Sequence, residues 1–371
     1  MLIILFLVVV ILAYANGSND NFKAMATLYG SSTLNYRSSL LLASIAQILG
    51  SLTSVILAGA LLKAFSGKGL VPEAIAGDPT FLLAVGAGAA ITVLMATRLG
   101  MPISTTHALI GGLVGSALAL APGELIWSSL GAKFLLPLLL TPFLATFGAA
   151  ALYPIARMCR KKLNIDEVTC LCVGKSIEPV AITSEGAMVA ARTGLELSVE
   201  QAEQCERRYL GSLIGIPAHR IVDWAHIFSG MSLGFARSLN DTPKIMALLM
   251  AVTWAGINSR LSLVIIAAAM CLGGLLHSAR IASTMGRRIT AMNRGQGFIA
   301  NFIASGLAIG ASLIGSPVSV THVSTGAIFG IGVWTGRSDW KVVGEILLAW
   351  LVTLPIAATI AFLIALGAGL I

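Results

Sequence analysis

Two short polar motifs, each present twice, stand out in a chain that is otherwise largely apolar. The motif Asn-Asp-x-x-Lys occurs at residues 19–23 and again, 221 positions later, at residues 240–244. The motif Pro-[Ile/Val]-Ser-x-Thr-His occurs at residues 102–107 and again, 215 positions later, at residues 317–322. Because both copies keep the same order and nearly the same offset, we interpret them as an internal duplication whose polar parts form one site.

The carboxylates Asp20 and Asp241 carry the clearest chemistry. A charged side chain within an apolar span costs about 2.5 kcal/mol or more, so each carboxylate needs a cationic partner. Lys23 and Lys244 follow three residues later and fall on the same helix face. Two interpretations stay open, namely structural Asp–Lys pairs or carboxylates that hold a coupling Na⁺ or receive protons. The second predicts Na⁺ ligands at Asp20, Asp241, Asn19 and Asn240.

The second motif supplies hydroxyl groups directly after a proline. A helix that starts there exposes backbone N–H groups, which favour an anion. Its hydroxyls either cap the helix start or face a ligand, and the paired occurrence favours an anion site. The predicted anion-binding residues are Ser104, Thr105, Thr106, Ser319, Thr321, Asn19, Asn240, Lys23 and Lys244.

The two carboxylates also bear on which anion binds. Hydrogen phosphate has a proton that it can donate to a carboxylate, whereas sulfate at neutral pH is only an acceptor. Two aspartates therefore favour phosphate, and sulfate stays open because bound Na⁺ would mask both charges. His107 and His322 are candidate proton carriers, since imidazole titrates near neutral pH; buried structural histidines are the alternative.

The composition indicates which elements hold these residues. Of 371 residues, 57% are hydrophobic and 11% are charged, where soluble domains have roughly 25% charged residues. Several apolar segments reach the ~20 residues that a helix needs to cross a bilayer. We expect an all-α polytopic membrane protein with a first membrane repeat at 1–156, a polar cytoplasmic linker at 157–208 and a second membrane repeat at 209–371. Within the linker, residues 195–208 are predicted to be helical.

Each half follows one plan. A helix is interrupted at the Asn-Asp motif, and in the second half we expect it to restart at Pro243, because proline suits a first helical turn. After the second motif, Gly111 and Gly115 align with Gly326 and Gly330, a spacing that lets helices approach closely. For residues 100–121 three forms stay open, namely a re-entrant hairpin, a single span, or a half-helix followed by a span. Asn16 is interpreted as a contact between helices.

The charge distribution excludes some classes of protein. The net charge is +8, and the linker, with eight basic and eight acidic residues, contributes none of it. The excess lies between spans, which disfavours nucleic-acid binding and suits an anionic solute. Residues 277–297 contain four arginines and no acid, which predicts a cytoplasmic loop. The P-loop, metalloprotease and serine-triad patterns are absent from the sequence, so we expect no enzyme activity.

These motifs resemble the PiT family of inorganic phosphate transporters, whose hallmarks are a duplicated Gly-x-Asn-Asp and a duplicated Pro-[Val/Ile]-Ser-[Thr/Ser]-Thr-His. The resemblance covers both membrane halves. It implies inverted repeats, a midplane site where Asp20 and Asp241 bind Na⁺ and the Ser/Thr hydroxyls face phosphate, and secondary transport coupled to Na⁺ or H⁺. A polar intracellular segment between the halves is also similar to the family.

The chain departs from the family pattern at some positions. Ser238-Leu239 stands where the second copy commonly has Gly, Val320 replaces a hydroxyl residue, and Lys23 occupies a position that is often Ala. An ammonium beside the aspartate can stand in for Na⁺, and lysine in the second repeat is similar to bacterial members thought to use protons.

The sequence thus predicts a phosphate importer of the cytoplasmic membrane, coupled to Na⁺ or H⁺, that works by alternating access. It needs no cofactor, has the lipid bilayer and no nucleic acid as a partner, and a homodimer is compatible with such folds. A sulfate permease of the same fold and a passive anion channel are the alternatives.

Overall fold

The computed structural model describes residues 1–67, 69–166, 168–182, 188–201, 203–204, 214–249 and 258–369. The chain is mostly helical and divides into two compact units. One unit contains Met1–Leu152 together with His226–Ile371, and the other contains Tyr153–Ala225. The first unit thus contains parts of both halves of the chain, and the second contains the predicted linker together with flanking residues on both sides.

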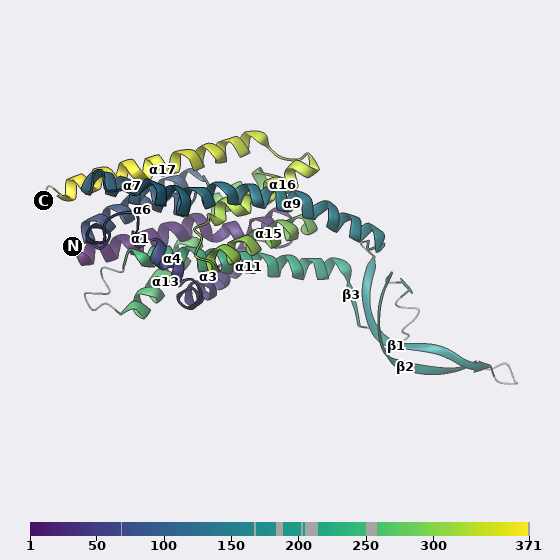
Figure 1. Ribbon diagram of the computed structural model, residues 1–371. Coiled ribbons are helices and arrows are strands. Elements are labelled where there is room, and N and C mark those ends of the chain that lie inside the picture. The colour runs from purple at the N-terminus through teal and green to yellow at the C-terminus, as the bar shows by residue number, and fades with distance from the viewer. Residues whose placement is uncertain are drawn as a thin grey trace. The chain divides into compact units, whose positions relative to one another are not determined.

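The first half contains eleven described helical elements in chain order, shown from purple to blue in Figure 1. They are α1 (Leu2–Asp20), the 3₁₀ helix η1 (Asn21–Met25), α2 (Ala26–Gly30), α3 (Tyr36–Leu57), α4 (Gly59–Ala64), α5 (Glu73–Ala76), α6 (Pro79–Leu99), α7 (Thr105–Leu120), α8 (Trp127–Leu130), the π-helical η2 (Gly131–Leu135) and α9 (Leu136–Lys162).

The second half follows the strands of the linker. Its described helical elements are α11 (Ala218–Ala247), α13 (Ser259–His277), α14 (Ala279–Ser283), the π-helical η3 (Thr284–Arg288), α15 (Arg294–Leu313), α16 (Val320–Thr335) and α17 (Trp340–Gly369).

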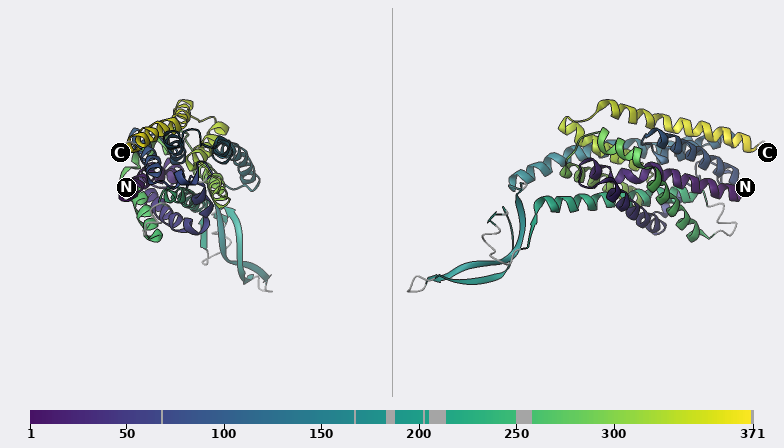
Figure 2. Two further views of the ribbon diagram at one scale, coloured as in Figure 1. Left: turned by 60° about the vertical axis from the view of Figure 1, so that its left-hand side comes forward. Right: turned by 180° about the vertical axis from the view of Figure 1, so that it is seen from behind.

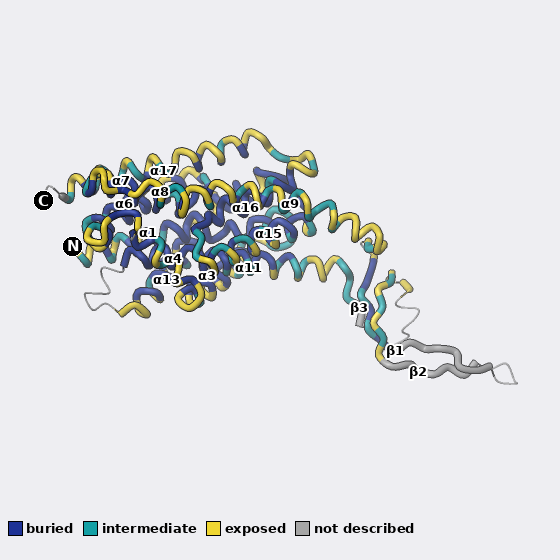
Figure 3. The backbone as a smooth tube through the Cα atoms, in the orientation of Figure 1, coloured by how far each residue is buried: buried dark blue, intermediate teal, exposed yellow. Residues whose placement is uncertain are grey.

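Seven helical segments in the described part of the chain are long and apolar enough to cross a bilayer. They are Leu2–Gly30, Tyr36–Leu57, Pro79–Leu99, Trp127–Lys162, Ser259–His277, Arg294–Leu313 and Trp340–Ala368. Large apolar side chains are exposed on their outer faces, with Ile56 82% exposed and Leu351 74% exposed. Figure 3 shows the exposed residues on the outside of the bundle and the buried ones at its centre. Because water would disfavour so much exposed apolar surface, the outside faces lipid and the protein is a multi-pass membrane protein.

The two copies of the Asn-Asp motif differ in backbone. In the first copy, α1 ends at Asp20 and the chain tightens into the 3₁₀ helix η1, as an interrupted helix requires. In the second copy, α11 continues as one α-helix through Pro243 to Ala247, so the expected restart at the proline does not occur. Proline removes one backbone donor but the surrounding packing keeps the helix, because Pro243 and its neighbours are buried and Thr242 bonds Ser51 across to α3.

The second motif forms the turn of a helical hairpin in each half. In the first, α6 ends at Gly100, which has a φ of 70° that favours glycine, and the irregular residues 101–104 lead into α7. With 16 residues, α7 is shorter than a spanning helix. In the second half, α15 and α16 make the corresponding hairpin. Residues 100–121 contain an irregular turn followed by the single helix α7, and which of the three forms they take in a bilayer stays a prediction.

The two halves exchange their last long helices. A Cβ added at Gly111 or Gly115 of α7 would lie 2.3 or 2.0 Å from backbone oxygens of α17. A Cβ added at Gly326 or Gly330 of α16 would lie 2.6 or 2.2 Å from backbone oxygens of α9. Figures 1 and 2 show α17 (yellow) beside α7. The predicted close approach at these glycines is confirmed, and each contact joins helices of different halves.

The linker region folds differently from expectation. It contains a three-stranded sheet in the order β2-β1-β3, with β1 at Thr169–Ile182, β2 at Met188–Gln201 and β3 at Ile214–Pro217. The β1–β2 pair is antiparallel and runs from Thr169↔Gln201 to Ile182↔Met188. The helix predicted at 195–208 is wrong for residues 195–201, which belong to β2. Residues 203–204 are helical, and residues 202 and 205–208 lie outside the described residues. In this stretch apolar and polar residues alternate from Leu195 to Val199, the period of a strand.

Candidate functional site

Lys23 joins the two halves of the membrane unit. Its ammonium donates to the Asp20 carboxylate, to the carbonyl of Ile103 at 2.6 Å and to the hydroxyl of Thr321 at 2.7 Å. Asp20 and Ile103 belong to the first half and Thr321 to the second. The ammonium is therefore held in a cage of carboxylate, carbonyl and hydroxyl oxygens that only the assembled halves complete.

Lys244 makes the corresponding contacts in the second half. Its ammonium lies 2.7 Å from the hydroxyl of Thr106, 2.9 Å from the carbonyl of Val318 and 3.5 Å from the carboxylate of Asp241. In this cage Asp241 and Val318 belong to the second half and Thr106 to the first. Both lysines are almost fully buried.

The two cages correspond position by position. Ile103 and Val318 are the second residues of the duplicated Pro-x-Ser-x-Thr-His motif, and Thr106 and Thr321 are its fifth residues. Each lysine takes the carbonyl from its own half and the hydroxyl from the other half. The duplication seen in the sequence is thus also a duplication of contacts, with the threonines exchanged between the halves.

One asparagine joins the two carboxylates. The amide nitrogen of Asn16 lies 2.8 Å from Oδ2 of Asp20 and 3.1 Å from Oδ2 of Asp241. The first carboxylate also accepts a 2.8 Å hydrogen bond from Thr105. Asn16 therefore makes the contact between helices that the sequence indicates, and through it both carboxylates are joined.

Sequence reasoning missed Arg237, which is 1% exposed. Its guanidinium donates to Oδ1 of Asn16 at 2.9 Å and to Oδ1 of Asn21 at 3.2 Å, and its Nε lies 3.9 Å from the Asp241 carboxylate. Two signals point to it in the sequence. It precedes Asp241 by four residues, which is ion-pair spacing on a helix, and the offset of 221 makes it the counterpart of Asn16.

The additional arginine changes the charge of the site. Two lysines and one arginine face two aspartates, so the five ionised groups carry a formal net charge of +1. With lysines and aspartates alone the site is neutral. A buried site with one surplus positive charge favours a bound anion.

Asn19 and Asn240 tie the first motif to the second in each half. Asn19 donates to Thr97 at 2.9 Å and to the Met101 carbonyl at 3.1 Å, and it accepts from the Ile103 N–H at 3.2 Å. Asn240 donates to the Val318 carbonyl at 3.0 Å. These contacts hold the irregular turn before each half-helix, and ligation by either asparagine stays a prediction.

The hydroxyl residues of the second motif divide into two groups. Ser104 and Ser319 cap α7 and α16, each accepting from a backbone N–H three residues later at 3.2 Å. Thr105, Thr106 and Thr321 reach the carboxylate or the ammonium groups. The structure thus brings the three threonines, both lysines and both aspartates into contact, whereas the described side-chain contacts of Ser104 and Ser319 are the helix caps.

Comparison with known proteins decides the family. The family model described as "Phosphate transporter family" matches residues 16–361, which includes all four motifs. The chain belongs to the phosphate transporter family. This family member is 26% identical over 395 residues to a relative from Pyrococcus abyssi that carries a phosphate permease name, covering 95% of the chain and 94% of the relative.

Other relatives of this family member extend to plants and to a solved structure. It is 26% identical over 413 residues to the chloroplastic inorganic phosphate transporter 2-1 of Arabidopsis thaliana, covering 94% of the chain and 69% of the relative. A solved structure of a protein named "The sodium-dependent phosphate transporter" superposes with a TM-score of 0.76 at 19% identity, covering 100% of the chain and 99% of that structure. The latter shows that the two share a fold.

In this family member the predicted proton carriers His107 and His322 lie against each other. Their ring centroids are 4.4 Å apart, and His322 stacks on Trp350 at 3.7 Å. Nδ1 of His107 and Nε2 of His322 have no hydrogen-bond partner among the described residues. Both rings line an apolar cavity of about 960 Å³ between α9, α16 and α17. A role in proton transfer stays a prediction.

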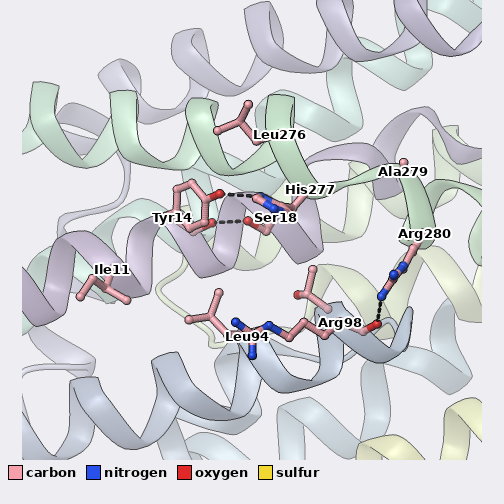
Figure 4. A pocket seen from close by; sticks show the side chains of 10 residues that line it. Ile11, Tyr14, Ser18, Leu94, Arg98, Leu276, His277, Ala279 and Arg280 are labelled. Carbon is pink, nitrogen blue, oxygen red and sulfur yellow. Dashed lines mark hydrogen bonds between the residues drawn. The ribbon is translucent and has the colours of Figure 1, made fainter.

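A second cavity adjoins the site near Asn19. It has a volume of about 650 Å³ and lies between α1, α6 and the end of α13 (Figure 4). Thr97, which accepts the hydrogen bond from Asn19, is one of its lining residues. The figure also shows Tyr14 bonded to His277 at 2.5 Å and Arg280 directed at the main chain of Arg98.

Proposed function

We propose that this protein imports inorganic phosphate by symport with a cation across the cytoplasmic membrane. The observation that carries the proposal is the exchanged pair of lysine cages, because neither half can complete a cage alone. A site divided between two halves changes when one half moves against the other, as alternating access requires. Membership of the phosphate transporter family supports the substrate.

The charge of the site supports coupling to a cation. With a formal charge of +1 when empty, the site becomes −1 when it holds the dianion HPO₄²⁻. One monovalent cation restores neutrality, and burying an unbalanced charge is costly. The net charge thus favours a coupling ratio of one transported cation for each HPO₄²⁻. The remaining positive charge is supplied by the lysine and arginine side chains of the protein.

The donors and acceptors favour phosphate over sulfate. Lys23, Lys244 and Arg237 offer N–H donors to anionic oxygens, and the carboxylate of Asp20 or Asp241 can accept a hydrogen bond from the single P–OH group of HPO₄²⁻. Sulfate has no proton to donate and meets two carboxylates as an acceptor. A sulfate permease is the second candidate, distinguished by competition.

Two observations bear on the coupling ion. The structural neighbour is named as sodium-dependent, which supports Na⁺ for that protein. Here each cage of hard oxygen ligands holds a lysine ammonium, which occupies the space and charge of a monovalent cation. This occupancy favours H⁺ carried on Asp20 or Asp241, with Asn19 and Asn240 as neighbouring ligands if Na⁺ binds instead.

We further propose that the two halves are inverted repeats. The equivalent helices α1 and α11 bring their aspartates next to each other, since Asn16 bonds both Asp20 and Asp241. In Figure 1, α1 enters from the N-terminal side of the bundle and α11 enters from the opposite side. Opposite directions of equivalent elements support a two-fold axis in the membrane plane, with the site near the midplane.

The test is uptake of ³²P-phosphate into proteoliposomes under an imposed Na⁺ gradient, an imposed pH gradient, or neither. We expect accumulation above the external concentration under one of the two gradients, insensitive to excess sulfate. Matched liposomes with Asp241→Asn protein serve as the inactive control. Equilibration without accumulation indicates a passive channel, and full suppression by sulfate indicates a sulfate permease.

A further inference from the structure

The cavity in Figure 4 is strongly basic for a pocket beside membrane helices. Its ten lining residues include Arg98, Arg280 and His277, and none of these ten is acidic. The guanidinium of Arg280 donates to the carbonyl of Arg98, which holds the two arginine positions together. Among the residues that the structure describes, no carboxylate lies within ion-pair distance of either guanidinium.

Such charges need a partner. An arginine near the end of a membrane helix extends its charged group to water, and where it lines a cavity it can attract an anion there. Here the arginines are exposed to the cavity at the end of α6 and in α14, while Ile11, Leu94 and Leu276 form its apolar wall. In Figure 4 the Arg98 guanidinium lies beside Leu94, and the Arg280 guanidinium reaches the main chain of Arg98. A guanidinium with no described carboxylate suits an oxyanion, which arginine binds with paired N–H donors.

The cavity shares a wall with the central site. Thr97 lines the cavity and its hydroxyl accepts from the side chain of Asn19 at 2.9 Å. Ser18, also in the lining, is the residue before Asn19. Thr97 therefore connects the basic cavity to Asn19, the residue next to Asp20 in the chain.

We propose that this cavity is a second anion site, in which Arg98 and Arg280 attract a phosphate-type oxyanion on the path that also contains the central site. This inference rests on the proposed function for the path and not for the binding itself. The bound group is either free phosphate or the phosphate of a lipid headgroup, because both present the same oxygens.

The first experiment measures the phosphate concentration dependence of uptake in proteoliposomes for Arg98→Gln and Arg98→Lys. We expect Gln to raise KM about three- to tenfold with the maximal rate kept within twofold, and Lys to restore most of the affinity. The rise should shrink at high salt, because exposed charges are screened. Arg337→Gln, which removes an exposed arginine outside the cavity, is the matched control. An unchanged KM in Arg98→Gln overturns the proposal.

Two lipid compositions separate the sources of the oxyanion. Vesicles of phosphatidylcholine alone contain no lipid with a net negative charge, so free phosphate is the anion that the cavity meets there. Adding phosphatidylglycerol should leave the wild-type KM unchanged if the cavity takes free phosphate. A KM that rises with phosphatidylglycerol in the wild type and not in Arg98→Gln assigns the site to a lipid headgroup.

A second measurement does not depend on transport. Leu94→Cys places a thiol in the cavity wall. We measure the rate at which it reacts with anionic and with cationic methanethiosulfonate reagents, after subtracting the rate measured for the wild-type chain. We expect the anionic reagent to react faster and free phosphate to slow it. Arg98→Gln should reduce that preference several-fold. Equal rates for the two reagents with Arg98 present contradict the second site even where uptake is intact. A preference without any uptake leaves the second site standing and refutes the proposed function.

Discussion

The two Asp–Lys centres come from one duplicated motif, yet they differ in how tightly they are satisfied. Asp20 accepts from Lys23 and receives bonds of 2.8 Å from both Thr105 and Asn16. Asp241 is 3.5 Å from Lys244 and 3.1 Å from Asn16, and position 320 has a valine in place of the threonine. The first centre is compact and the second is looser.

The two centres also differ in net charge. One carboxylate balances one ammonium at the first centre, whereas Asp241 faces both Lys244 and Arg237. The surplus positive charge therefore lies at the second centre. From this difference we infer that the first centre fixes the geometry of the site and that the second provides most of the attraction for the anion.

Neutralising the carboxylates should have the largest effect. Asp20→Asn leaves the buried ammonium of Lys23 without its counter-charge, and breaking a buried pair costs about 3–5 kcal/mol. We expect uptake to fall more than 100-fold in both Asp20→Asn and Asp241→Asn. The thermal unfolding midpoint in detergent should fall further for Asp20→Asn, because its contacts are shorter.

Glu345→Gln is the control for the loss of a carboxylate. Glu345 is 40% exposed and lies 3.7 Å from Arg288, so its removal should change the unfolding free energy by about 1 kcal/mol or less. Equal midpoints for Asp20→Asn and Asp241→Asn, or a lower midpoint for Asp241→Asn, would refute the compact first centre.

Arg237→Gln should have the next largest effect. It removes the surplus charge and two hydrogen bonds, to Asn16 and Asn21, each typically worth about 1.5–3 kcal/mol when one partner is charged. We expect the KM for phosphate to rise about 10- to 100-fold. Arg237→Lys keeps the positive charge but loses the planar set of guanidinium donors, so its KM should lie between those of the wild type and Arg237→Gln. If Arg237→Gln and Arg237→Lys have the same KM, then the second centre does not attract the anion through its positive charge.

Thr105→Val makes the first centre resemble the second. It removes the hydroxyl that donates to Asp20, at a cost of about 1 kcal/mol. We expect a lower unfolding midpoint and a KM changed by less than threefold. Thr359→Val removes an exposed hydroxyl that bonds only its own helix in the described contacts, and it should leave both values unchanged. A Thr105→Val midpoint equal to that of Thr359→Val would show that the hydroxyl does not stabilise the centre.

Val320→Thr makes the opposite change and should have the smallest effect. Val320 is buried, and a hydroxyl there would correspond to that of Thr105 and face Asp241. We expect an unfolding free energy within about 0.5 kcal/mol of the wild type, since the new hydrogen bond offsets the burial of a hydroxyl. A loss above about 2 kcal/mol in the same thermal assay would mean that the hydroxyl finds no partner.

The sequence predicts the motif residues of the site because charge is conspicuous in apolar spans. Asp20, Lys23 and their counterparts Asp241 and Lys244 could be paired by spacing alone, since residues three apart share a helix face. The close-packed glycines were also predictable, because their four-residue spacing recurs in both halves. The family assignment from the same motifs is confirmed.

Other features depend on contacts that spacing does not encode. The bond between Arg237 and Asn16 joins helices 221 residues apart, and the exchange of Thr106 and Thr321 between the lysines requires the assembled halves. The helix through Pro243 persists because tertiary packing overrides a local preference. In the linker, composition favoured a helix and the alternation of side chains that marks β2 was overlooked.

The exchange of the last helices has a consequence for biogenesis. The glycine face of α7 ends at residue 120, but its partner α17 begins at residue 340. At a synthesis rate of roughly 5–20 residues per second, Gly115 waits on the order of tens of seconds for Ala358. During that interval the groove faces lipid or an insertion factor. A chain truncated before α17 would therefore leave the glycine face of α7 without the helix that covers it.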